Sequence, residues 1–457
     1  TEILVKGSLS APAITYDMIS PPAAVSAPPA PCEQQMISGN ASCQKMNVSV
    51  TEANYYTIDA DALIVSEENT EEYGSIIENE FRNVNRMPLS TFSTDVDAAS
   101  YSNVRRFVNA GYMPPSDAVR IEEMINYFSY NYPKLVGSNP FSITMEASVC
   151  PWNTSHRLIH VGLQAKEIET KELPPNNLVF LLDVSGSMDE PDKLPLLKSS
   201  LRMLVAQLRK QDKVSIVVYA GSAGLVLPAT PGNKKDEILA AIDNLSAGGS
   251  TAGGEGIVLA YRIAKQNFLY SGNNRVILAT DGDFNVGVSD DAELVKLIEK
   301  KREEDIFLTV LGFGEGNYKD SKMEQLADKG NGNYSYIDNI LEGKKVLVSE
   351  MGATLVTIAK DVKIQVEFNP EKIKSYRLIG YENRLLADED FNDDKKDAGE
   401  IGSGHSVTAL YEVVPAGTME EDPAVDPLKY QKPSAVTTIG SNAVSYTHLT
   451  LPTNREV

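Results

Sequence analysis

Hydrophobic positions between residues 174 and 358 follow two alternating patterns. Short apolar runs such as 178–182 are rich in branched residues and apolar on both faces, which is typical of strands buried in a parallel sheet. The stretches between these runs repeat apolar residues at helical spacing. The two patterns predict strands at 178–182, 213–220, 224–230, 275–283, 306–313 and 333–337, and helices at 194–208, 236–245, 255–268, 290–303, 320–329 and 339–358.

This alternation of strands and helices indicates the α/β fold class, with a doubly wound and mostly parallel sheet. The run at 224–230 contains a proline, so we expect it at the one antiparallel edge of the sheet. Period-two patterns lie on both sides of the α/β region and predict further strands. These strands are expected at 141–149 and 157–164 before the region, and at 361–370, 376–384 and 406–415 after it.

Strands on both sides of the α/β region predict one β-sandwich that the α/β domain interrupts. Such an insertion would let a shift of the last helix of the α/β domain be felt by the sandwich. Two helices, at 92–111 and 116–130, are expected to form a small N-terminal helical segment. Asp95 and Asp97 could suggest a second cation site, but we interpret them as helix caps.

Composition divides the chain into five parts. Residues 1–84 are predicted to be a mostly disordered linker rich in Pro, Ala and Ser, and residues 85–173 form an N-terminal module. The α/β domain takes residues 174–358, and a truncated β-rich module takes 359–441. Residues 442–457 match no pattern of the preceding module and resemble sequencing-adaptor read-through, so we expect them to lie outside the fold.

Five oxygen-bearing residues follow the ends of two predicted strands. Asp183, Ser185 and Ser187 come directly after the first strand, and Asp281 ends the strand at 275–283. Thr251 lies in the glycine-rich loop 247–256 between them. Ligand sites of open α/β sheets lie outside the carboxyl ends of the strands, where the strand order reverses. If the two strands are neighbours, the five residues converge.

The chemistry of this set favours a hard divalent cation. Oxygen ligands without His or Cys point to Mg²⁺, with Ca²⁺ or Mn²⁺ as alternatives, rather than to zinc or copper. Hydroxyl ligands are neutral, so they hold the ion without cancelling its charge, and an Asp or Glu of a protein partner could complete the shell. Taken singly, Asp183 or Asp281 is better explained as the cap of the next helix.

The same five residues carry a resemblance to a known family. In type, order and spacing they are similar to the metal-ion-dependent adhesion site of von Willebrand factor A domains, whose fold is Rossmann-like. The segments STFSTDVDAASYSNVRRFVNAG, AVRIEEMINYF and CPWN before the domain, and the strands after it, resemble the bacterial YfbK-like family. The resemblance implies a cation-dependent adhesion or scaffolding protein of the cell envelope, either periplasmic or on the outer surface.

Composition and charge narrow the function classes. The net charge of -21 over 457 residues argues against nucleic-acid binding, because no basic stripe is present to neutralise phosphates. No apolar run reaches the roughly 20 residues of a membrane helix. The sequence does not begin with Met, so we expect that an N-terminal piece, with or without a lipid anchor, is missing. Cys32, Cys43 and Cys150 leave the disulfide state open.

We therefore predict a non-enzymatic, cation-dependent binding protein. Three alternatives remain open: a regulator of an ATPase complex, a Mg²⁺-dependent phosphoesterase, and a purely structural ion. The glycine-rich loop lacks the Lys-Ser/Thr of a phosphate-binding loop, and no Gly-x-Ser-x-Gly motif is present. Asp283 is expected to be a supporting or surface acid, and Trp152 a core or packing anchor.

Overall fold

A computed structural model describes the greater part of the chain. Of the predicted site, Thr251 and Asp283 lie outside the described residues, as do Cys32, Cys43 and most of the 1–84 segment. Cys150 is buried and forms no disulfide with any residue that the structure describes. The described residues are 7–8, 70–133, 139–168, 173–220, 222–249, 253–282, 291–316, 318–350, 357–393, 398–418 and 443–451.

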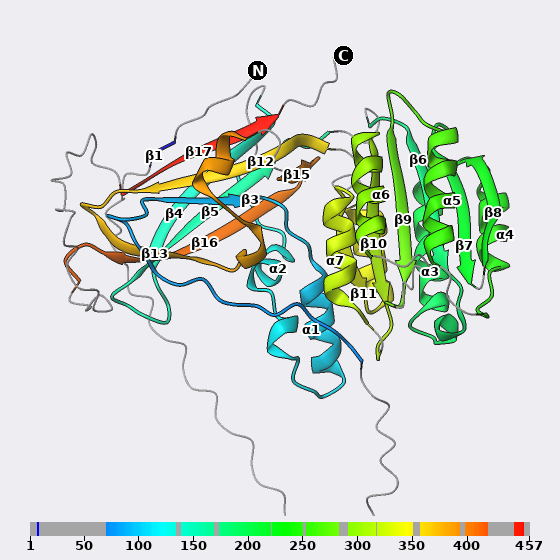
Figure 1. Cartoon of the computed structure of the whole chain (residues 1–457), viewed down its shortest axis with the longest axis horizontal. Helices are drawn as coiled ribbons and strands as arrows, with labels where there is room; N and C mark the ends of the chain where they lie inside the picture. The colour runs from blue at the N-terminus through cyan, green and yellow to red at the C-terminus, as the bar shows by residue number, and fades with distance from the viewer. Residues whose placement is uncertain are drawn as a thin grey trace, which may run out of the picture. The chain divides into compact units, whose positions relative to one another are not determined.

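The α/β domain is built on one six-stranded sheet with the order β11-β10-β9-β6-β7-β8 (Figure 1). Every neighbouring pair is parallel except β7 with β8, so the predicted antiparallel edge is confirmed. Chain order reverses at β6, which lies between β9 and β7. The strands are β6 (Asn176–Asp183), β7 (Lys213–Ala220), β8 (Ser222–Pro231), β9 (Asn273–Thr280), β10 (Ile306–Phe313) and β11 (Tyr334–Ile337).

Helices cover both faces of this sheet, as the doubly wound prediction requires. One hydrophobic cluster joins the sheet to α5 (Gly253–Gln266), α6 (Asp291–Glu303) and α7 (Asp320–Lys329). A second cluster on the opposite face joins it to α3 (Leu194–Gln207) and α4 (Lys235–Asp243). The strands between the two clusters are buried on both faces, which explains their unbroken apolar sequences.

Two further sheets form the β-sandwich that the sequence predicts. Strands from before and after the α/β domain pair with one another, so the domain is inserted into the sandwich: β3 (Leu89–Ser93) pairs with β12 (Thr357–Phe368), and β5 (Arg157–Ala165) pairs with β16 (Ser406–Pro415). The remaining strands are β1 (Gly7–Ser8), β2 (Arg82–Asn83), β4 (Phe141–Val149), β13 (Ile373–Ile379), β14 (Leu385–Leu386), β15 (Gly399–Gly402) and β17 (Val444–Leu451).

Several predicted boundaries are corrected. The first helix, α1, begins only at Ala99 and ends at Asn109, because the residues before it pair with β12 as β3. The predicted helix at 116–130 is a 3-10 turn followed by the short α2 (Ile121–Asn126). The predicted last helix is α8 (Ile340–Lys344), continued by a π-helical turn over Lys345–Ser349.

Two expectations about single segments are also wrong. Residues 444–451, which we expected outside the fold, form β17 and pair with β12 through backbone hydrogen bonds. Trp152 is 56% exposed and is therefore not a core residue. Trp152 lies in the turn after β4, and the sequence of a turn does not predict whether such a side chain is buried or exposed.

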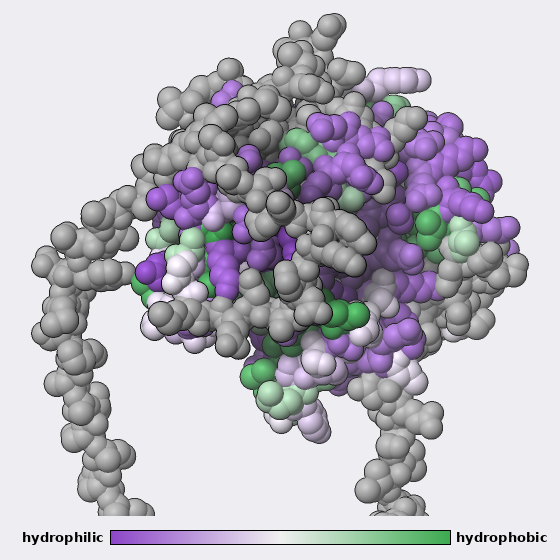
Figure 2. Space-filling view, turned by 60° about the vertical axis from the view of Figure 1, so that its left-hand side comes forward, coloured by the Kyte–Doolittle hydropathy of each residue, from purple (hydrophilic) through white to green (hydrophobic). Residues whose placement is uncertain are grey.

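The described surface is mainly polar. On the face shown in Figure 2, hydrophobic residues form small separate groups among hydrophilic ones. None of the helices in the described part of the chain is long and apolar enough to cross a membrane.

Candidate metal centre

The first half of the candidate metal centre is the turn that leaves β6. Asp183 is the last residue of that strand, and its carboxylate Oδ1 accepts a hydrogen bond from the Ser185 backbone N–H at 2.9 Å. The Ser185 and Ser187 hydroxyl oxygens lie 3.0 Å apart. Asp183 and Ser185 are buried, whereas Ser187 is exposed. The turn therefore gathers its oxygens at one spot with an edge open to solvent.

Backbone hydrogen bonds fix this turn against the glycine-rich loop. The Gly186 N–H donates to the Gly249 carbonyl at 3.1 Å, and the Gly248 N–H donates to the Val184 carbonyl at 2.8 Å. These bonds confirm that residues 248 and 249 lie beside the aspartate turn. The position of Thr251 itself stays a prediction.

The second half of the centre is Asp281, directly after β9, the neighbour of β6 in the sheet. One oxygen of Asp281, Oδ2, accepts from the Lys193 ammonium at 3.2 Å. The other oxygen, Oδ1, is buried and has no hydrogen-bond partner among the residues that the structure describes. Between the two acids, the Thr280 hydroxyl donates to Asp183 Oδ2 at 3.2 Å. The predicted convergence of the two strand ends is thus present in the structure.

The electrostatics of the centre suit a cation. Burial, and to a smaller degree the Asp281 carboxylate, raise the pKa of Asp183 to about 6. An unpartnered buried carboxylate oxygen costs free energy that a positive ion would recover. The donor set of two carboxylates and two hydroxyls fits a hard dication such as Mg²⁺. Within the described ranges, no group of three or more His, Cys, Asp or Glu side chains is arranged to hold a metal.

Lys193 is a residue of this site that the sequence analysis missed. It is the N-cap residue of α3, where the helix dipole disfavours a cation. In the sequence, this unfavourable placement is the signal that the positive charge of Lys193 has a role other than stabilising the helix.

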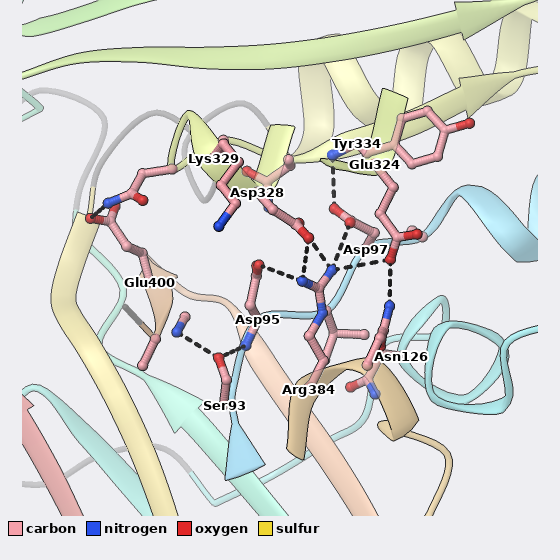
Figure 3. A pocket seen from close by; sticks show the side chains of 18 of the residues that line it. Ser93, Asp95, Asp97, Asn126, Glu324, Asp328, Lys329, Tyr334, Arg384 and Glu400 are labelled. Carbon is pink, nitrogen blue, oxygen red and sulfur yellow. Dashed lines mark hydrogen bonds and ion pairs between the residues drawn. The ribbon is translucent and has the colours of Figure 1, made fainter. Parts of the chain in front are cut away.

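A second polar site lies where the α/β domain meets the sandwich. A cavity of about 400 Å³ is bounded by α7 and β11 on one side and by β3, β14 and β15 on the other (Figure 3). The side chain of Arg384, in the turn after β13, points toward acidic residues that line this cavity. Its guanidinium pairs with four carboxylates, at 2.6 Å from Asp328, 3.3 Å from Asp97, 3.4 Å from Glu324 and 3.5 Å from Asp95.

The Arg384 network corrects our interpretation of Asp95 and Asp97 as helix caps. The N-cap residue of α1 is Ala98, which makes no side-chain capping bond. Asp97 instead accepts from the Tyr334 backbone N–H of β11 at 2.7 Å. Burial, followed by the nearby Asp95 and Asp328 carboxylates, raises the pKa of Asp97 well above its usual value. These acids join the N-terminal module to the α/β domain.

Three family models match successive parts of the chain. Residues 67–160 match the family model described as von Willebrand factor, residues 177–345 the von Willebrand factor type A domain, and residues 353–451 the C-terminal region of the uncharacterized protein YfbK. YfbK of Escherichia coli is 47% identical over 378 residues, covering 81% of this chain and 65% of that protein. The chain therefore spans slightly less than two thirds of that relative.

More distant similarities cover smaller or larger parts of the chain. An uncharacterized protein of Synechocystis is 30% identical over 186 residues, which is 41% of this chain and 43% of that protein. Among solved structures, a von Willebrand factor type A protein of Catenulispora acidiphila matches 75% of this chain and 67% of its own, with 17% identity and a TM-score of 0.39. BatB of Bacteroides thetaiotaomicron matches 38% of this chain and 96% of its own, with 23% identity and a TM-score of 0.33.

Proposed function

The chain is a YfbK-like bacterial protein that contains a von Willebrand factor type A domain, and from this premise we propose that it binds protein partners through a divalent cation. Domains of this type mediate protein–protein interaction. Asp183, Ser185 and Ser187 would hold the ion from the first turn, Asp281 would hold it directly or through water, and Thr251 would join the set. An Asp or Glu of the partner would complete the shell.

One observation carries this proposal. Within the described part of the chain, the buried Oδ1 of Asp281 has no hydrogen-bond partner, and Asp281 directly follows β9, the strand beside β6 and the Asp183 turn. A cation at this position would satisfy that oxygen and offset the repulsion between the two carboxylates. The exposed Ser187 supports access from solvent for a partner. The ion would act by attracting a carboxylate, against the repulsion of a chain whose net charge is -21.

We include in the proposal a location in the bacterial cell envelope and a binding rather than a catalytic role. The location is supported by the resemblance of the modules on both sides of the A domain. Mg²⁺ is the proposed ion, with Ca²⁺ and Mn²⁺ as alternatives. Turnover of a generic phosphoester with Mg²⁺, lost on substitution of Asp183, would contradict the binding role.

Calorimetric titration of Mg²⁺, Ca²⁺ and Mn²⁺ into the whole chain tests the ion directly. We expect saturable binding to one site in the unchanged protein and an affinity at least about tenfold lower in the double variant Ser185→Ala/Ser187→Ala, because two oxygen ligands are lost. The control is Ser199→Ala, which removes a hydroxyl that only donates within α3. Equal binding in the double variant and the control would remove the serines from the site.

A pH titration gives a second expected result. Because the pKa of Asp183 is raised to about 6, the folded protein without metal binds this proton more strongly than the unfolded chain does. The cation-free protein should therefore lose stability as the pH rises from about 4 to about 6. A bound cation should restore the lost stability only above about pH 6, where Asp183 is ionised. We expect saturating Mg²⁺ to raise the melting temperature clearly at about pH 7.5 and hardly at about pH 5. A metal-induced shift of equal size at both pH values would contradict this assignment.

A further inference from the structure

Lys193 places a buried positive charge against the candidate metal centre. Its side chain is only 9% exposed, and its ammonium donates to Asp281 Oδ2 at 3.2 Å. Buried lysines occur where a partner compensates their charge. Here the partner is one oxygen of a proposed metal ligand, and the other oxygen of that same carboxylate has no hydrogen-bond partner in the described ranges.

The backbone around Lys193 is shaped to hold its aliphatic stem. Gly314, after β10, has a φ of +71°, and a Cβ at this position would lie 2.7 Å from Lys193 Cγ and 2.8 Å from Cδ. Both the conformation and the close approach therefore require glycine. The Gly314 carbonyl is fixed in turn by the buried hydroxyl of Tyr336, which donates to it at 2.8 Å. The aliphatic stem of Lys193 therefore packs directly against the Gly314 backbone.

We propose that Lys193 is the built-in counter-ion of the Asp281 carboxylate in the metal centre. It engages one oxygen of Asp281, leaves the other oxygen for the cation, and keeps the cation-loaded centre positively charged. This inference rests on the proposed function and extends it to the tuning of the site.

The charges explain why such a residue is useful. Asp183 and Asp281 carry two negative charges and Lys193 one positive charge, so a dication converts a centre with one net negative charge into one with one net positive charge. Without the ammonium, the loaded centre would be neutral. At short range in a partly buried site, one additional positive charge strengthens the binding of a partner carboxylate and weakens the binding of the metal ion. Lys193 would thus weaken cation binding and strengthen binding of the acidic partner.

The test compares the unchanged full-length protein with Lys193→Met, which keeps most of the buried aliphatic volume and removes the charge. Calorimetry with Mn²⁺ should show at least about tenfold tighter binding in Lys193→Met, since the repulsion between ammonium and dication is gone. Lys234→Met is the matched control: it removes one positive charge from an exposed pair with Glu237, distant in sequence from the centre. The affinity of this control should change less than about twofold.

Thermal melts add a readout that does not depend on affinity. In the presence of a chelator, Lys193→Met should melt at a lower temperature than the unchanged protein, because Asp281 loses its compensating charge. Saturating Mn²⁺ should remove this difference in melting temperature. Acetate serves as a probe of the partner carboxylate. It should bind the Mn²⁺-loaded unchanged protein more tightly than Mn²⁺-loaded Lys193→Met, as followed by the water-proton relaxation of the bound ion.

The outcomes separate this inference from the proposed function. If the unchanged protein binds no Mn²⁺, the metal centre itself is refuted. If it binds Mn²⁺ and Lys193→Met binds equally or more weakly, the centre stands and the counter-ion role is overturned. Should Lys193→Met not fold, Lys193→Gln, which is neutral but can still donate to Asp281, must show the same tighter binding for the inference to survive.

Discussion

Replacing Arg384 by methionine is expected to lower the free energy of unfolding by about 3–5 kcal/mol, because it leaves buried carboxylates without their counter-charge. The Arg384 side chain is 10% exposed and pairs with Asp97 and Asp328, among other acids, which come from opposite sides of the junction. Denaturant unfolding of both proteins measures the loss. The loss should grow with rising pH, because burial raises the pKa of Asp97 well above its usual value, so that its ionised form is unfavourable in the fold once Arg384 is removed.

Arg202→Met is the matched control for this prediction. Arg202 also forms an ion pair, with Asp243 at 2.6 Å, but both side chains are about half exposed. Exposed pairs contribute roughly 0–1 kcal/mol, so this variant should unfold almost as the unchanged protein does. Similar losses in the two variants would mean that Arg384 does not hold the two parts of the chain together.

Asp183→Asn is expected to have two effects of opposite sign. Cation binding should fall at least about a hundredfold, because a charged ligand of a hard dication is replaced by a neutral amide. The cation-free protein should become more stable by about 1–3 kcal/mol at neutral pH, since the raised pKa of Asp183 means that its ionised form is unfavourable in the fold. Calorimetry with Mg²⁺ and denaturant unfolding with a chelator measure the two effects.

Asp212→Asn separates a metal ligand from an ordinary buried aspartate. Asp212 accepts from the backbone N–H of Asn176 at 3.0 Å and from that of Arg209 at 2.8 Å, and it pairs with the Arg209 guanidinium. Its replacement should cost stability of about 1–3 kcal/mol and leave cation binding unchanged. If Asp183→Asn behaves in the same way, Asp183 is a structural residue and the metal centre loses its central ligand.

The sequence predicts the part of the site that follows from strand ends. Asp183 and Asp281 each end a continuous apolar run, and parallel strands bring their carboxyl ends to one edge of the sheet, so their proximity follows from local patterns alone. The α/β sheet and the insertion into the sandwich are predictable for the same reason, because each strand has its own periodicity. Thr251 remains a prediction from this reasoning.

The features that the sequence does not predict depend on partners far along the chain. Arg384 is one polar residue in an apparently alternating strand, and nothing near it reveals that its carboxylate partners include Asp97, 287 residues away. The segment that becomes β3 reads locally as the approach to a helix, but pairing with β12 fixes it as a strand. The role of Lys193 likewise depends on distant residues: its ammonium pairs with Asp281, 88 residues later, and its stem packs against the Gly314 backbone.

The interleaved pairing of the sandwich has a consequence for synthesis on the ribosome. β5 has β4 on one side, but its partner on the other side, β16, emerges only after the whole α/β domain has been made. The α/β sheet has all its strands within one continuous stretch, so it can form as soon as that stretch leaves the exit tunnel. During that interval the β4–β5 hairpin exposes an unpaired edge, which is prone to pairing with other chains. The late C-terminal strands therefore complete the fold and close this edge, and their arrival ends the period in which a nascent chain is most open to misassociation.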